Sequence, residues 1–266
     1  MSLSAQVANN LPFLRRYARA LSGSQATGDA FVRATLEAVL ADKTLQDSLS
    51  GGRVPLYNVF NKVWSSAYLD VPQDQPLGNS GEHEVAVRER LGAITPLNRQ
   101  ALLLTTLEDF TMAETAKILD LDENRVADLV REAIDEIDRE STTSVLIIED
   151  EPLISMQLEE LVSSLGHTIC GTAATRTQAQ KVVAERMPGL VLADIQLADG
   201  SSGLDAVDDI LEIASVPVIF ITAYPERLLT GDRPEPTYLV TKPFQEATVR
   251  TAISQALFFG SSRPLP

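Results

Sequence analysis

Residues 145–154 read VLIIEDEPLI, four apolar residues followed by three acids and the start of an amphipathic stretch. The continuous apolar run Val145–Ile148 is typical of a parallel strand that is buried on both faces. Glu149 and Asp150 then fall at the carboxyl end of that strand, where open α/β sheets gather their ligands. This stretch predicts the first strand of a parallel sheet with an acidic site at its edge.

The residues that follow alternate between strand and helix patterns. Because the connections are short, the alternation predicts a doubly wound, flavodoxin-like (βα)5 domain over residues 143–266. After the fourth strand the chain is rich in Pro, Gly and charged residues up to Thr237, so a full fourth helix is left open. The expected strands are 145–148, 168–173, 190–193, 216–222 and 238–241, and the expected helices are 152–165, 175–187, 203–214 and 244–259.

The polar residues at the strand ends form a chemical set. The third strand ends in Asp194, the fourth in Thr222, and the fifth leads into Lys242. Crowded carboxylates repel one another and invite a divalent cation, and hard oxygen ligands favour Mg²⁺. Phosphoryl transfer to a carboxylate needs an aspartate nucleophile, a metal, a cation for the phosphoryl oxygens and a hydroxyl donor. Asp194, the Glu149/Asp150 pair, Lys242 and Thr222 supply these groups in that order. Acids at strand ends also cap helices, and for Glu149 alone that interpretation is the better one.

Residues 144–260 resemble the receiver domains of two-component response regulators. The matching stretches are VLIIEDEPLI (145–154), VLADIQL (191–197), VIFITA (218–223) and TKPF (241–244), the last with a lysine followed by a cis-capable proline. The resemblance implies that a sensor histidine kinase phosphorylates Asp194, with Thr222 as the switch residue. It also implies that Mg²⁺ binds Asp150, Asp194 and the backbone carbonyl of Gln196 directly, and Glu149 through water.

Two features depart from the receiver pattern. The fourth strand continues as FITAYPE (220–226), and the aromatic switch residue of the family is not obvious. Tyr238 is a candidate, but it lies four residues before Lys242. A half-buried strand tyrosine describes Tyr238 equally well.

The first 140 residues read as helical. Apolar stripes predict a helix with Pro12 near its start, a second helix through Ala30–Val39, and a third after Pro55. We expect a helical subdomain at 1–70, a linker at 71–84 and a second subdomain at 85–140. In the second subdomain Thr95-Pro96 is an N-cap followed by proline at the first helical position.

A helix-turn-helix is expected within the second helical subdomain. Thr111 with Glu114 forms a capping-box pattern for a short helix that ends near Leu119. A longer helix follows, after a tight turn at Asp120–Asp122. Its expected buried stripe is Val126, Leu129, Val130, Ala133, Ile134 and Ile137.

The charge of the chain argues against nucleic acid. Residues 1–140 hold 14 basic and 21 acidic side chains, a balance of −7, and residues 141–266 hold 8 and 16, a balance of −8. The presumed recognition helix, 123–139, holds three arginines against six acids. DNA affinity comes largely from cations that replace counterions on phosphates, so such a helix is a poor DNA reader.

The helical half resembles group IV (extracytoplasmic function) sigma factors. LPFLRRYARALSGSQATGDAFVRATLEAVL (11–40) resembles the core of sigma region 2, and 91–137 resembles the region 4 helix-turn-helix. A sigma-like half followed by a receiver resembles the family of PhyR-type general stress response regulators of alphaproteobacteria. That resemblance implies a NepR-type anti-sigma factor as partner. Phosphorylation would release the sigma-like half from the receiver, and the released half would sequester the anti-sigma factor and free the stress sigma factor.

Two other functions are weighed against this one. A response regulator could act on promoters directly through the helix-turn-helix, and an RNA-binding antiterminator would also pair a receiver with a helical bundle. An ordinary enzyme is disfavoured because the chain has no glycine-rich phosphate loop, and His83 and His167 lie in linker or turn contexts. The single Cys170 suits a reducing cytoplasm, and the absence of about 18 consecutive apolar residues argues against a membrane protein.

Overall fold

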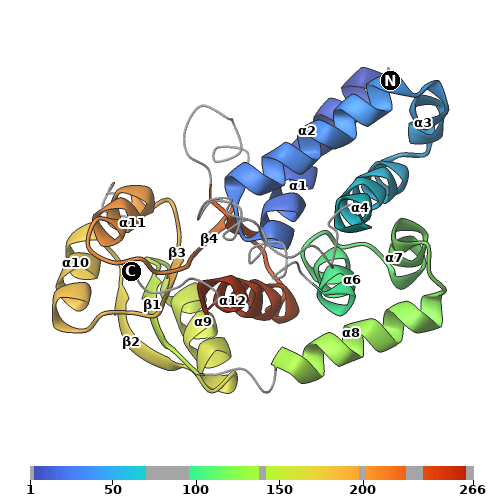
Figure 1. Cartoon of the computed structure of the whole chain (residues 1–266). Coiled ribbons are helices and arrows are strands. Elements are labelled where there is room, and N and C mark those ends of the chain that lie inside the picture. Colours follow the sequence, from blue (N-terminus) through green and yellow to red (C-terminus); the bar gives the residue numbers. More distant parts are fainter. Residues whose placement is uncertain are drawn as a thin grey trace, which may run out of the picture. The chain divides into compact units, whose positions relative to one another are not determined.

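The computed structural model describes residues 3–69, 96–137, 142–197, 200, 202–225 and 236–261. The chain divides into two compact units, Met1–Ala133 and Ile134–Pro266, each described below by itself (Figure 1). The expected linker at 71–84, the helical pattern from 85 to 95 and most of the segment that could form a fourth receiver helix lie outside the described residues. Within the described part of the chain, no helix is both long enough and apolar enough to cross a membrane.

The first unit consists of helices. A short 3₁₀ turn, Leu49–Gly51, links two of them. The helices are α1 (Leu3–Ser22), α2 (Gln25–Ala41), α3 (Lys43–Ser48), α4 (Arg53–Leu69), α6 (Leu97–Thr106), α7 (Met112–Leu119) and α8 (Glu123–Ile137), of which α8 continues past the boundary of the unit.

Close backbone contact holds α1 against α2. A side chain at Gly28 would come within 2.7 Å of the backbone nitrogen of Arg19, so only glycine allows this approach. One residue later, Asp29 accepts hydrogen bonds from both Arg19 (2.8 Å to Oδ2) and Arg15 (3.1 Å to Oδ2). The tight approach of the two helices thus brings a carboxylate between two guanidinium groups.

Several details of the helical prediction were wrong. The first helix begins at Leu3, so Pro12 lies in its interior. Packing of α1 against α2, α4 and α6 stabilises the helix although Pro12 removes one backbone donor. Pro96 is the N-cap of α6 rather than its first residue, since its ψ of 158° is extended. Ile134 is 37% exposed although it was assigned to the buried stripe of α8, and the short α3 was not expected.

The helix-turn-helix was predicted well. Thr111 accepts from the backbone N–H of Glu114, and the Glu114 side chain accepts from the backbone N–H of Thr111, so the capping box is present. Helix α7 ends at Leu119, and Asp120 closes it in the left-handed conformation with φ of 53°. Four residues of the expected stripe on α8 are buried: Val126, Leu129, Val130 and Ala133.

The second unit is the flavodoxin-like domain that the sequence predicts. Its elements are β1 (Ser144–Ile148), α9 (Pro152–Ser164), β2 (Thr168–Ala173), α10 (Arg176–Glu185), β3 (Leu190–Ala193), α11 (Gly203–Leu211), β4 (Val218–Thr222), β5 (Tyr238–Thr241) and α12 (Glu246–Ser261). All neighbouring strands are parallel, and their order is β2-β1-β3-β4-β5. The strand prediction differs most at β4, which begins two residues later than expected.

Alternating side chains of the central strands face two helical layers. Leu146 and Ile148 belong to the cluster that includes Ala179 of α10 and Val207 of α11. Helices α9 and α12 cover the opposite face of the sheet (Figure 1). Because all the strands are parallel, the polar residues that follow them gather at the carboxyl edge of the sheet.

Candidate functional site

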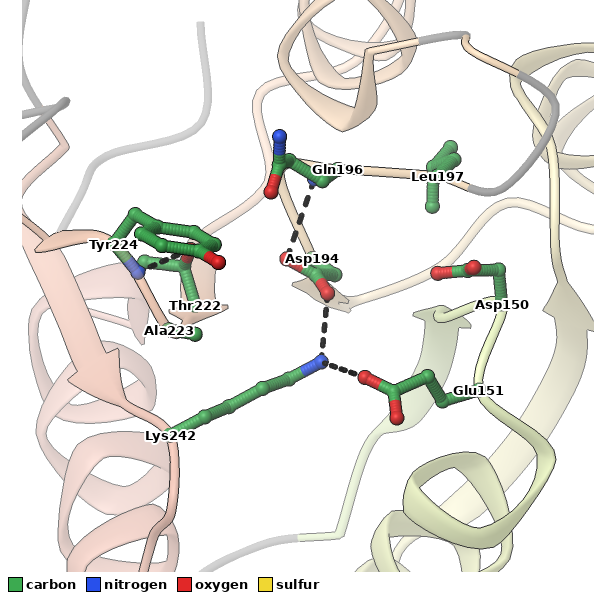
Figure 2. Close-up of a pocket in the computed structure, with 9 residues that line it drawn as sticks. All are labelled: Asp150, Glu151, Asp194, Gln196, Leu197, Thr222, Ala223, Tyr224 and Lys242. Atoms are coloured by element: carbon green, nitrogen blue, oxygen red, sulfur yellow. Dashed lines mark hydrogen bonds and ion pairs between the residues drawn. The ribbon is translucent and has the colours of Figure 1, made fainter.

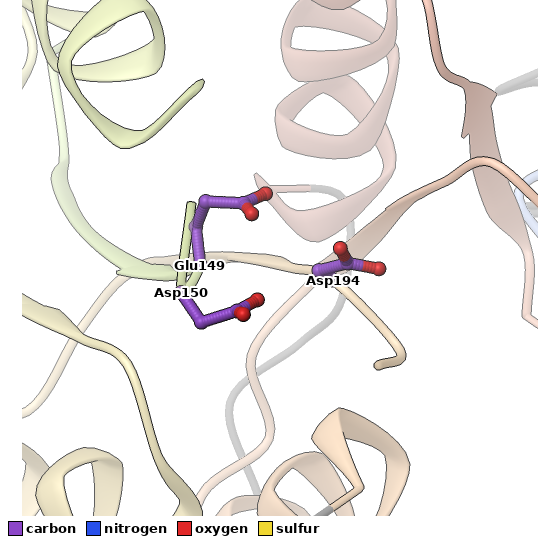
Figure 3. Close-up of side chains that lie close together, drawn as sticks. All are labelled: Glu149, Asp150 and Asp194. Atoms are coloured by element: carbon purple, nitrogen blue, oxygen red, sulfur yellow. The ribbon is translucent and has the colours of Figure 1, made fainter. Parts of the chain in front are cut away.

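Three carboxylates converge where β1 and β3 end. The Asp194 backbone N–H donates to the carbonyl of Ile148 (2.8 Å), and the Glu149 N–H donates to the carbonyl of Ala173 (2.9 Å), so the sheet ladder itself sets their positions. Figure 3 shows the Glu149 and Asp150 side chains reaching from one strand toward the same space as Asp194. One carboxylate oxygen of each of the three lies within 4.8 Å of the other two.

Lys242 supplies the positive charge among these acids. Its Nζ atom lies 2.6 Å from Asp194 Oδ2 and 2.8 Å from Glu149 Oε2, and its side chain is only 9% exposed. Glu151 contributes a more distant carboxylate, with Oε1 3.7 Å from the same Nζ (Figure 2). The peptide bond from Lys242 to Pro243 is cis.

The charges in this site shift the affinities of its groups for protons. Burial raises the pKa of Glu149, and the nearby Lys242 opposes that rise without cancelling it. Burial alone would lower the pKa of Lys242, but its hydrogen bonds to Asp194 and Glu149 outweigh burial, so its pKa is raised. Lys242 therefore stays an ammonium group at neutral pH.

The N-terminus of α11 lies against the backbone of Asp194. A Cβ atom at Gly203 would come within 1.7 Å of the Asp194 carbonyl oxygen, and the Gly203 N–H donates to the carbonyl of Ile195 (2.8 Å). Ser202 caps the helix by accepting from the N–H of Leu204 (3.1 Å). The Asp194 Oδ1 atom accepts from the N–H groups of Ile195 and Gln196. This tight loop fixes the orientation of the Asp194 carboxylate.

A hydroxyl group and an aromatic ring complete the opposite wall of the site. Thr222 is 1% exposed, and its Oγ1 accepts from the N–H of Tyr224 (3.1 Å), while its carbonyl accepts from the N–H of Lys242 (2.8 Å). Tyr224 is 44% exposed and lines a cavity of about 390 Å³. The cavity is bounded by Asp150, Glu151, Asp194, Gln196, Leu197, Thr222, Ala223, Tyr224 and Lys242 (Figure 2).

The donor set suits a hard divalent cation. Glu149, Asp150 and Asp194 offer only carboxylate oxygens, which are the ligands that Mg²⁺ and Ca²⁺ prefer. Lys242 balances part of the negative charge through Asp194 and Glu149, whereas no ion pair to Asp150 is found within the described residues. The cluster thus has capacity for a further positive charge on its Asp150 side.

Comparison with known protein families accounts for both units. Residues 7–61 match the model of the Sigma2 domain of PhyR, 91–140 that of the sigma-like domain of response regulator PhyR, and 145–254 that of the response regulator receiver domain. The phyllosphere-induced regulator PhyR of Methylorubrum extorquens is 53% identical over 263 residues, which cover 98% of this chain and 97% of that protein. The chain belongs to the PhyR family.

Solved structures of PhyR proteins agree over nearly the whole chain. The anti-anti-sigma factor PhyR from Bartonella quintana is 46% identical with a TM-score of 0.85, and the match covers 98% of this chain and 97% of that one. The response regulator PhyR from Brucella abortus is 45% identical with a TM-score of 0.83, with coverages of 98% and 96%. The predicted architecture of a sigma-like half followed by a receiver is confirmed.

The structure brings every predicted site residue of this PhyR protein to one edge of the sheet. Gln196 also lines the cavity. Tyr238 does not, because it pairs with Ile219, at the far end of β4 from Thr222, and its hydroxyl donates to the carbonyl of Gln255 (3.3 Å). That position favours the alternative in which Tyr238 is a packed strand residue.

Four residues that line the cavity were not predicted as part of the site: Glu151, Leu197, Ala223 and Tyr224. Tyr224 was noted only as a departure from the receiver pattern, although its place two residues after a strand-end threonine is a usable signal. Glu151 follows the acid pair directly, which is a usable signal, and it was not considered as a site residue; in the structure it is the N-cap of α9.

The second helix of the helix-turn-helix carries no free basic face within its described length. Arg125 pairs with Glu132 (3.0 Å) and Arg131 pairs with Asp128 (2.9 Å), all on α8 itself. The helix Glu123–Ile137 contains five acids and these two arginines, a balance of −3. Both guanidinium groups are therefore already paired with carboxylates, and the poor DNA affinity of this helix stays a prediction.

Proposed function

We propose that this protein is a phosphorylation-controlled anti-anti-sigma factor that binds a NepR-type anti-sigma factor through its sigma-like half. The proposal rests on two features that occur together in one chain. The receiver sheet carries the Lys242–Asp194 site at its edge, and the sigma-like half carries an acidic helix α8 where a DNA-binding protein would have its recognition helix. The Bartonella quintana relative, which matches the whole chain, bears the name anti-anti-sigma factor.

Asp194 is the proposed phosphoacceptor. One of its carboxylate oxygens attacks the phosphorus atom of the donor, the bond from phosphorus to the donor's leaving group breaks, and an acyl phosphate forms on Asp194. The donor is a phosphorylated sensor histidine kinase, with the imidazole nitrogen as leaving group. Lys242, which already binds Asp194 Oδ2, then compensates the charge of the phosphoryl oxygens.

Asp150 and Asp194 would hold Mg²⁺, together with the backbone carbonyl of Gln196, and Glu149 would act through water. When bound, the metal offsets charge on the phosphoryl oxygens during transfer. The clustering of the three carboxylates supports this assignment, since hard oxygen donors suit Mg²⁺. In this proposal Asp194 binds both the metal and the phosphoryl group.

Thr222 is the proposed sensor of the modified state. Its Oγ1 presently accepts from the N–H of Tyr224, so movement of the hydroxyl toward a phosphoryl oxygen breaks that bond and displaces the chain after β4. We infer that the binding surface of the sigma-like half is not available to the partner in the unphosphorylated state. Shifting such an equilibrium a hundredfold requires about 2.7 kcal/mol of differential stabilisation.

Binding measurements with and without a phosphodonor test the proposal. Acetyl phosphate with Mg²⁺ should raise the affinity of wild-type protein for a purified NepR-type anti-sigma factor, and should leave Asp194→Ala unchanged. A gain of affinity in Asp194→Ala would refute the switch. Salt-sensitive binding of the phosphorylated protein to promoter DNA in gel shifts would instead support a DNA-binding regulator.

A further inference from the structure

A single buried carboxylate joins the two parts of the sigma-like half. The Glu108 side chain is fully buried, and its Oε1 accepts from Arg16 Nε (2.9 Å). Its Oε2 accepts from Arg53 Nη2 (2.9 Å) and from the Tyr57 hydroxyl (2.7 Å). Helices α1 and α4 thus supply three donors to one acid in the turn between α6 and α7.

These contacts join two segments of the chain that match different family models. Arg16, Arg53 and Tyr57 lie in the segment 7–61, whereas Glu108 lies in the segment 91–140, and each segment matches a separate family model. The donors also hold the backbone around Glu108, since Arg16 Nη2 donates to the carbonyl of Leu107 (2.6 Å). The Arg53 guanidinium lies over the ring of Phe110, 4.6 Å from its centre.

A second set of contacts continues along α4. The Asn58 amide donates to the carbonyls of Lys117 and Ile118, both at 3.0 Å, at the end of α7. Lys62 forms an exposed ion pair with Asp120 at 3.2 Å. One face of α4 therefore contacts the 107–120 segment at both ends of α7, but only the Glu108 end is buried.

Because Glu108 is buried, its hydrogen bonds should form or break together. A carboxylate inside a protein is tolerated only when it is paired and hydrogen-bonded, so an intermediate displacement that breaks one of these bonds is unfavourable. Tyr57 contributes as a neutral donor: burial and then the charge of Glu108 hold the pKa of its hydroxyl well above the usual value of 10.0. The acid is either fully held by its three donors or released to water.

We propose that Glu108 is a latch that fixes the 97–119 segment on α1 and α4 and so preassembles a single anti-sigma-binding surface from both parts of the sigma-like half. The inference rests on the proposed function for the identity of the partner. Glu108 is a positioning residue, because it acts by fixing the elements that carry the surface. When the latch opens, the two parts separate and the composite surface is lost.

Distance measurements in the full chain test the latch without any partner. Spin labels at Leu40→Cys in α2 and Ala113→Cys in α7, both exposed, are placed in a Cys170→Ser background. One narrow distance distribution is expected, and Glu108→Gln should broaden it. The exposed acid Glu37 provides the matched control, since Glu37→Gln should leave the distribution narrow.

If Glu108→Gln does not fold, Tyr57→Phe, which removes one of the three donors, should broaden the distribution to a smaller extent. A narrow distribution in every variant overturns the latch.

Affinity for a purified NepR-type anti-sigma factor tests the positioning role. All variants are treated with acetyl phosphate and Mg²⁺. If the latched arrangement falls to about a tenth of the molecules, the apparent affinity falls about tenfold. Broadened distances with unchanged affinity would overturn the positioning role. Absence of binding in wild type would overturn the proposed function, and the distance measurements would still decide whether Glu108 is a latch.

Discussion

The ammonium nitrogen of Lys242 lies 2.6 Å from Asp194 Oδ2, so the cation of the site already contacts the carboxylate that is proposed to become phosphorylated. Asp194→Asn replaces a charged oxygen with an amide and removes the nucleophile. We expect no incorporation of phosphate from acetyl phosphate, measured by intact-protein mass. Asp208→Asn, at an exposed position on α11, should become phosphorylated like wild type. Equal labelling of Asp194→Asn and wild type would exclude Asp194 as the acceptor.

Removal of the metal should slow the same reaction. Chelation by EDTA, or the substitution Asp150→Asn, takes away charge compensation of about 3 kcal/mol, which corresponds to about a 100-fold lower phosphorylation rate. The rate is followed by quenched time points on phosphate-affinity gels. Added Mg²⁺ should restore the chelated wild type but not Asp150→Asn. Full activity in EDTA would contradict a metal-dependent site.

Substitution of Thr222 should distinguish the phosphorylation of Asp194 from the change in partner affinity that follows it. Thr222→Ala keeps the nucleophile and Lys242, so phosphate incorporation should continue. Because no hydroxyl remains to move toward the phosphoryl group, the gain in affinity for a NepR-type anti-sigma factor should be lost. Thr222→Ser retains the hydroxyl and should keep the gain. Calorimetric titration of each protein, with and without acetyl phosphate, measures this, and an unaltered gain in Thr222→Ala would remove Thr222 from the switch.

Gly203 should tolerate no side chain. In Gly203→Ala the new Cβ would overlap the carbonyl oxygen of Asp194, so α11 or the end of β3 must move. We expect the free energy of unfolding of the receiver to fall by about 3 kcal/mol. Ser202→Ala, which removes only the N-cap hydrogen bond, should cost about 1 kcal/mol. Urea unfolding curves of the two variants give the order, and a smaller loss in Gly203→Ala would contradict the close contact.

Asp29 should make the stability of the helical half depend on pH. Burial alone would raise the pKa of Asp29, but hydrogen bonds from Arg19 and Arg15 outweigh it and lower the pKa. Its contribution to stability is therefore complete above the unfolded pKa of about 3.9 and is lost as the pH falls through the lower folded value. Urea midpoints between pH 6 and pH 3 should fall more steeply in wild type than in Asp29→Asn. The exposed control Glu37→Gln should follow wild type, and identical slopes in wild type and Asp29→Asn would contradict this assignment.

The receiver fold and its site could be predicted because each depends on short segments. An apolar run such as Val145–Ile148 predicts a buried strand. The parallel order of the strands then brings Asp150, Asp194 and Lys242 to one edge of the sheet, independently of the loop conformations. The capping box of Thr111 and Glu114 was equally accessible, since both partners lie within four residues. Local patterns carried these predictions.

Features that depend on distant partners could not be predicted in this way. Glu108 reads as a surface acid after a leucine-rich helix, and only donors 92 and 55 residues away along the chain make it a buried one. Ile134 fits the helical period of α8 but is partly exposed. The period predicts which face of the helix a side chain lies on, but not whether another element covers that side chain. Tyr224 is a different case: its position two residues after Thr222 is a local signal, but no helical or strand periodicity marks it as part of the site.

The paired arginines of α8 also affect how many molecules are available to a protein partner. Basic reading helices adhere weakly to any DNA, because their free cations displace counterions along the phosphate backbone. On α8, Arg125 and Arg131 are already paired with acids of the same helix. We therefore expect the weak sites of chromosomal DNA to retain little of this chain through α8. A sigma-shaped molecule that DNA does not retain would compete for a scarce protein partner at its full concentration.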